Sequence, residues 1–163
     1  MRGAFAIRDA YFMWLAEGPL KASMQIPLDR NPSFDQNPGD LQLALLVPEL
    51  TARDLTVGML CCQALNVLRR LLAMIATPNQ TISVTTLMYW WPAQVPEGYI
   101  VLMNEKTPEA LVVLAHYCGM LYQIGSHWYM DGCVKKLLLY CKRNLSTRWL
   151  RLIQEPLATI GIG

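Results

Sequence analysis

Two long apolar segments, 55–76 and 110–125, constrain the fold of this chain more than any other feature. When the first segment is wound as a helix, apolar residues cover nearly all of its faces, which predicts a helix at the centre of the molecule. A membrane-spanning helix needs about 20 apolar residues with few charges. The first segment carries Arg69 and Arg70, and the second is short and contains His116. We therefore expect two buried core helices and no membrane span.

Prolines and capping residues mark where further helices begin. Thr107, Pro108 and Glu109 open a helix that reaches residue 124, because Thr caps, Pro suits the first turn and Glu complements the helix dipole. Pro96 likewise opens a helix over 99–104. Other helices are expected at 3–17, 56–75, 86–90, 127–144 and 146–153, with Thr56, Ser126 and Ser146 as caps of three of them, followed by a final turn from Pro156.

The remaining segments leave little room for a sheet. Segment 81–86 is β-branched, and an isolated strand is its alternative interpretation, but no second candidate strand exists and we expect a loop. Segment 26–40 is rich in Pro, Asn and Asp and predicts an exposed loop, with disorder as the alternative. Segment 41–50 is apolar but contains Pro48, so it predicts a short helix. The chain is thus predicted to be one compact all-α domain over 1–163, with six to eight helices.

The composition is apolar for a chain of this length. Hydrophobic residues make up 53% and charged residues 16%, which exceeds what a small core consumes. The surplus indicates a ligand cavity, a subunit interface or a missing partner domain. The net charge of +2 does not indicate nucleic-acid binding. The N-terminal residues lack the pattern of a signal peptide, so a cytoplasmic or nuclear location is expected.

The cysteines do not follow a metal-binding or disulfide pattern. Their number is odd and no CxxC pair occurs, so we expect reduced thiols that pack as small hydrophobic groups and no metal site. The five are Cys61, Cys62, Cys118, Cys133 and Cys141.

Several sequence blocks occur in an order that is similar to one known family. They are WWPAQVPEGYI at 90–100, PEALVVLAHY at 108–117, HWYMDG at 127–132, Trp149, and EPLATIG at 155–161. These blocks resemble the W-P-x-x-V-P-x-x-F/Y-I, P-x-A-L-V-I-L-A-H-Y, W-W-x-x-G and terminal W-P…I-G segments of fungal sterol-regulator-type zinc-cluster transcription factors. The resemblance extends over nearly the whole chain and concerns the C-terminal half of their regulatory domain.

The resemblance implies a helical domain that binds a sterol or another hydrophobic small molecule and forms a homodimer. The family's six-cysteine zinc cluster and basic region are absent from this sequence, as is the first half of the regulatory domain. We therefore expect no direct DNA binding by this chain.

Aromatic side chains, methionines and histidines supply the candidate site residues. An aromatic or Met side chain suits an apolar ligand pocket and an ordinary core equally well, and a mid-helix His most often satisfies a hydrogen bond in the core. The candidate ligand-binding residues are Trp90, Trp91, Tyr99, His116, Tyr117, Met120, Trp128 and Tyr129. If the protein is an enzyme, the candidate acid–base residues are His116, His127, Tyr129 and Asp131, since His127, Asp131 and Lys135 would share one helix face.

Three functions remain open at this point. The first is binding of a sterol, terpenoid or polyketide-like molecule in a helical pocket. The second is a cofactor-free cyclase or isomerase of fungal secondary metabolism that relies on pocket shape and one acid or base. The third is an interaction protein that pairs through its apolar faces. No cofactor motif is present.

Overall fold

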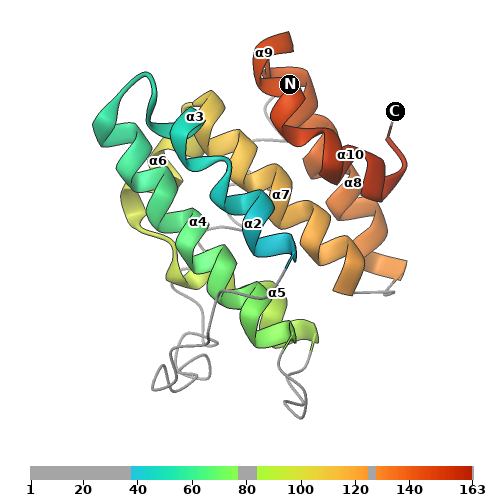
Figure 1. The fold of residues 1–163 in the computed structure, drawn as a ribbon. Coiled ribbons are helices and arrows are strands. Elements are labelled where there is room, and N and C mark those ends of the chain that lie inside the picture. Colours follow the sequence, from blue (N-terminus) through green and yellow to red (C-terminus); the bar gives the residue numbers. More distant parts are fainter. Residues whose placement is uncertain (1–37, 77–83, 125–127, 163) are drawn as a thin grey trace.

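The fold was examined in a computed structural model, which describes residues 38–76, 84–124 and 128–162. The described residues contain helices and no strand, so the all-α prediction is confirmed. Seven helices have seven or more residues, and two shorter ones, α3 and α9, accompany them (Figure 1). The elements are α2 (Pro38–Ala44), α3 (Val47–Thr51), α4 (Leu55–Ala76), α5 (Val84–Gln94), α6 (Glu97–Asn104), α7 (Pro108–Ile124), α8 (Trp128–Asn144), α9 (Thr147–Leu150), the 3-10 turn η2 (Arg151–Ile153) and α10 (Gln154–Ile160).

The central helix is α7, and the prediction that segment 55–76 takes this place is wrong. Every residue from Glu109 to Leu121 is buried, because α7 packs against α4 and α6 on one side and against α8 and α10 on the other (Figure 1). A helix that is apolar on all faces is stable only in such a position. In α4, one face is buried, while Leu55 and Met59 are 69% and 55% exposed.

The length and composition of α4 would also suit a membrane helix. Within the described part of the chain, it is the one helix that is long and apolar enough to cross a bilayer. Core helices of globular proteins pass the same test, and the α4 face that includes Cys61, Leu65 and Leu68 belongs to the hydrophobic core.

The cap of α4 differs from the one expected. The Asp54 side chain accepts hydrogen bonds from the backbone N–H groups of Thr56 and Val57, at 2.8 and 3.2 Å from Oδ1. A carboxylate satisfies the free N–H groups of the first turn and also complements the positive end of the helix dipole. Asp54, rather than Thr56, therefore caps α4.

Two proline-containing helices are longer than predicted. Helix α5 covers 84–94 rather than 86–90 and contains Pro92, and the backbone continues past this proline with a bond from Val95 N–H to Trp91 C=O at 3.1 Å. Helix α10 begins two residues before Pro156, which is tolerated because the first-turn N–H groups lack intrahelical partners. The αL conformation of Gly161, with φ of 73°, then ends α10.

The end of the predicted exposed loop is a packed helix. Residues 26–37 lie outside the described residues, but Pro38, Gly39 and Asp40 form the first turn of α2. Asp40 is buried and accepts hydrogen bonds from both Nε and Nη2 of Arg69, the latter at 2.8 Å. The prediction of an exposed loop is wrong for these three residues, because the ion pair with α4 holds this turn against the core.

Candidate functional site

An aromatic cluster brings together three of the predicted ligand-binding residues. The Trp91 and Tyr117 rings are stacked, with centroids 4.3 Å apart and planes 23° apart. Tyr99 meets the edge of Trp91 at 5.7 Å and 79°. All three side chains are buried, as is Trp90 beside them in α5. The cluster fills the space where α5, α6 and α7 meet.

Two polar groups of this cluster, the Trp91 N–H and the Tyr99 O–H, form hydrogen bonds within the core. Trp91 Nε1–H donates to the carbonyl of Ala64 in α4 at 2.9 Å, and Tyr99 O–H donates to the carbonyl of Ala110 in α7 at 2.9 Å. Burial raises the pKa of Tyr99 well above its ordinary value, so the phenol stays protonated. These bonds tie α5 to α4 and α6 to α7, as expected for buried tryptophan and tyrosine side chains.

His116 faces the 3-10 turn η2 and helix α10 rather than this cluster, and its environment is different. Its Nε2 is 2.8 Å from the carbonyl oxygen of Leu152, which only accepts hydrogen bonds, so Nε2 carries the proton. Burial lowers the pKa of His116, which keeps the imidazole neutral at pH 7. Its second nitrogen, Nδ1, is therefore an acceptor, and it lies 3.7 Å from Oε2 of Glu155 in α10.

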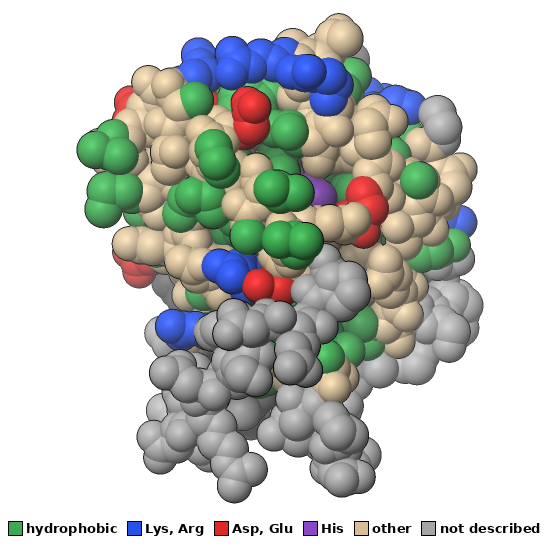
Figure 2. Space-filling model, viewed as in Figure 1, with side chains coloured by type: hydrophobic (Ala, Val, Ile, Leu, Met, Phe, Trp, Pro, Cys, Tyr) green, Lys and Arg blue, Asp and Glu red, His purple; other side chains and the backbone are tan. Residues whose placement is uncertain are grey.

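A depression of about 60 Å³ opens above His116, between α2, α4, α7 and α10. Figure 2 shows a histidine side chain reaching the surface in this region, with apolar and acidic side chains around it. The walls are mainly apolar, and the polar side chains are His116, Glu155, Thr159 and two glutamines. The lining residues are Gly39, Gln42, Leu43, Leu68, Leu72, His116, Gly119, Met120, Gln123, Glu155, Pro156 and Thr159.

Gln42 connects α2, on one side of this depression, to α10. Its amide is satisfied when Nε2 faces Glu155, where it donates to both carboxylate oxygens at 3.1 and 3.2 Å. Sequence reasoning missed both residues. Gln42 falls in a segment that was treated only as a short apolar helix, and Glu155 was noted only as part of a terminal motif, so neither carried a local chemical signal.

Two of the predicted ligand-binding residues, His116 and Met120, line the depression, whereas Trp90, Trp91, Tyr99 and Tyr117 do not. His127 lies outside the described residues. The first turn of α8 includes the backbone of Trp128, Tyr129 and Asp131, whose side chains lie outside the described part of the structure.

A second depression, of about 220 Å³, lies along another face of α10. Its wall is formed by Lys142, Leu150, Gln154, Leu157, Ala158 and Ile162. The aliphatic parts of these residues dominate the wall, and the Gln154 amide is bonded to the Leu150 carbonyl at 3.0 Å. The candidate residues named from the sequence are absent from it.

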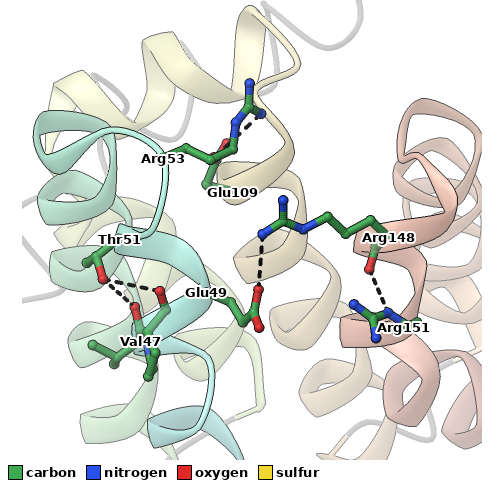
Figure 3. Close-up of polar contacts among 8 residues, drawn as sticks. Val47, Glu49, Thr51, Arg53, Glu109, Arg148 and Arg151 are labelled. Carbon is green, nitrogen blue, oxygen red and sulfur yellow. Dashed lines mark hydrogen bonds and ion pairs between the residues drawn. The ribbon is translucent and has the colours of Figure 1, made fainter.

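Charged residues connect α3, α7 and α9 at a third place (Figure 3). Arg53 is 3.8 Å from the buried carboxylate of Glu109, in the first turn of α7, and Arg148 reaches from α9 to Glu49 of α3 at 3.6 Å. The second pair is half exposed on both sides, and such pairs contribute about 0–1 kcal/mol. The Arg53–Glu109 pair supports the N-terminus of the central helix, and neither pair borders a cavity described above.

The thiols do not form a reactive or metal-binding group within the described residues. Cys61, Cys118 and Cys141 are buried as predicted, and burial raises the pKa of Cys61 and of Cys141 to about 12. A thiol with so high a pKa is a poor nucleophile. Cys133, in contrast to the prediction, is exposed. No cluster of three or more His, Cys, Asp or Glu side chains suited to a metal ion occurs among the described residues.

Comparisons with known proteins found no match for this chain. No family model matches the chain, and neither a curated protein nor a solved structure is similar to it.

Proposed function

We propose that this protein binds a hydrophobic small molecule, of the size and character of a sterol, terpenoid or polyketide, at the depression above His116. One observation carries the proposal: an acceptor nitrogen on a largely buried side chain opens into a hollow whose walls are mainly apolar. Binding sites for small molecules combine apolar walls with a few polar groups that orient the ligand. The depression has this combination, whereas in the aromatic cluster the polar groups of Trp91 and Tyr99 are hydrogen-bonded within the core.

The depression holds only part of such a ligand. Pockets for drug-sized molecules measure about 300–1,000 Å³, and this one measures about 60 Å³. The polar end of the ligand and the ring next to it would occupy the hollow, and the rest of its body would extend along α2.

Helix α2 supplies the surface for that extension. Its inward residue Leu43 is 4% exposed, while Leu41 is 66% exposed and Leu45, just after the helix, is 68% exposed. Large apolar side chains that face solvent on both sides of a lining residue favour an apolar partner over water. Because α2 has only seven residues, a small shift of this helix against α4 would widen the hollow.

A matched pair of substitutions tests this site. Gln123→Trp places a bulky ring at the rim of the depression, and Gln63→Trp makes the same change on an exposed position of α4 that does not line it. In a panel of sterols, terpenoids and polyketides, a true ligand at 100 times its Kd raises the melting temperature by roughly 5–10 °C. We expect this increase in wild type and Gln63→Trp and its loss in Gln123→Trp. An equal increase in all three proteins, or none in any, contradicts the proposal.

A second candidate is catalysis of an isomerisation or cyclisation without a cofactor. It is favoured by the same nitrogen, since a neutral imidazole with a free Nδ1 is a general base. Incubation of a bound metabolite with wild type and with His116→Gln decides this. Turnover that the substitution abolishes supports catalysis, and recovery of the unchanged compound from wild type excludes it for that compound.

We also propose that the protein pairs with a second copy. Leu55 and Met59 of α4 and Val101 of α6 are more than half exposed, which supports an apolar contact surface. The mass in solution, measured by light scattering, is expected to be that of two chains. Replacement of Leu55 and Met59 by Gln should give a single chain, and a monomeric wild type contradicts pairing.

A further inference from the structure

Two polar groups that line the depression, the buried His116 Nδ1 and the half-exposed Glu155 carboxylate, are both acceptors. His116 Nδ1 has no proton, because the single proton of the neutral ring is on Nε2, where it is bonded to the Leu152 carbonyl. The Glu155 carboxylate also only accepts. The two atoms are 3.7 Å apart, which is too long for a hydrogen bond and places two acceptors close together.

Within the described residues, the neighbouring groups supply a donor to Glu155 but none to His116 Nδ1. The Gln42 amide donates to the two oxygens of Glu155, and therefore fixes the carboxylate without satisfying His116 Nδ1. The other donors in the lining are the Gln123 amide, at the exposed rim, and the Thr159 hydroxyl, and among the described residues neither is hydrogen-bonded to His116 Nδ1. A carboxylate retains lone pairs for further bonds beyond those from one amide.

From this arrangement we infer that the ligand presents a hydrogen-bond donor to His116 and Glu155, and that the site therefore selects hydrophobic alcohols and amines over ketones, esters and carboxylates. This inference rests on the function proposed above. A hydroxyl or amino group placed between the two acceptors bonds to at least one of them and removes their repulsion. A carbonyl oxygen adds a third acceptor, and a carboxylate adds a second negative charge beside Glu155.

The test compares two probes with the same carbon skeleton, menthol and menthone, by isothermal titration calorimetry. A lost hydrogen bond to a buried acceptor corresponds to about a tenfold change in Kd, so menthol should bind about tenfold or more tightly than menthone. Glu155→Gln puts a donor beside Nδ1 and should reduce the preference to less than about threefold. The exposed Glu105→Gln, away from the depression, should leave it unchanged.

The outcomes separate this inference from the function on which it rests. Equal affinities for menthol and menthone overturn the inference and leave hydrophobic binding standing. If neither probe binds at any accessible concentration, both fail. Independently of any ligand, the ¹⁵N NMR spectrum of the free protein should show an unprotonated Nδ1 and a protonated Nε2 for His116, and the reverse tautomer overturns the inference by itself.

Discussion

The stacked rings of Trp91 and Tyr117, 4.3 Å apart, join α5 to the central helix α7 inside the core. Tyr99 and the Ala64 carbonyl complete the surroundings of the indole. This arrangement makes Trp91 the residue through which a short, proline-containing helix is held in the fold.

Replacement of Trp91 by Ala should therefore be among the most destabilising single changes. It removes a fully buried ring and its hydrogen bond and leaves a cavity, for which the expected cost is about 3–5 kcal/mol in the free energy of unfolding. Urea unfolding measures this cost, with the exposed Lys136→Ala as the control, which should stay within about 0.5 kcal/mol of wild type. A cost below about 1 kcal/mol for Trp91→Ala would show that the cluster is not part of the core.

Glycines in α7 and α8 should respond in opposite ways to the same substitution. A Cβ at Gly119 would be 2.9 Å from Cβ and 3.2 Å from Cα of Pro156, so Gly119→Ala pushes α10 away from α7 at an expected cost of about 1–3 kcal/mol. At Gly132, no atom of the described residues outside its own turn of α8 lies within 4 Å of the added carbon. Gly132→Ala should stabilise α8 by about 0.5–1 kcal/mol, because alanine favours the helical conformation. Chemical denaturation of both variants checks this, and effects of the same sign would contradict the close α7–α10 contact.

Two tyrosine hydroxyls give a second matched comparison. Tyr140 Oη is buried without a hydrogen-bond partner in the described part of the chain, while Tyr99 O–H donates to Ala110. Tyr140→Phe removes a buried polar atom that is not satisfied and should raise the free energy of unfolding by up to about 1 kcal/mol. Tyr99→Phe should lower it by about 1 kcal/mol. Thermal unfolding of the two variants distinguishes them, and a loss of stability in Tyr140→Phe would mean that its hydroxyl is bonded.

The Asp40–Arg69 pair should make the attachment of α2 dependent on pH. The hydrogen bond from Arg69 holds the pKa of Asp40 below its ordinary value of 3.8. A lowered carboxyl pKa contributes stability above the unfolded-state pKa, and this contribution is lost as the pH falls through the folded-state value. Asp40→Asn should therefore cost about 1–3 kcal/mol at pH 7, and the two unfolding free energies should converge as the pH falls through the lowered pKa of Asp40. A difference that does not change with pH would exclude this ion pair as the cause.

Particular helices show how much of the fold could be predicted from the sequence. The start of α7 follows from Thr107 and Pro108, because capping and proline geometry act within one turn of the chain. Helix α6 begins at Glu97, directly after Pro96, rather than at the predicted residue 99. The identity of the central helix could not be predicted in this way. Segment 55–76 and α7 are similarly apolar, and only the packing of α4, α6, α8 and α10 decides which of them is enclosed.

The same limit applies to the candidate site. The sequence offers His116 as a candidate, but its chemistry depends on the Leu152 carbonyl 36 positions away and on Glu155 and Gln42 from two other helices. Aromatic residues gave a stronger sequence signal, but the fold places four of them in the core because their rings fill the space between helices.

Photoaffinity labelling tests the location of the binding site most directly. A hydrophobic alcohol that carries a diazirine is irradiated with the protein, and the labelled peptides are identified by mass spectrometry. Labels should fall on α2, α7 and α10 around Gln42, Met120 and Thr159, and an excess of menthol should suppress them. Labels confined to the depression near Lys142 and Leu157, or labels that menthol does not suppress, would contradict the assignment of the ligand to the hollow above His116.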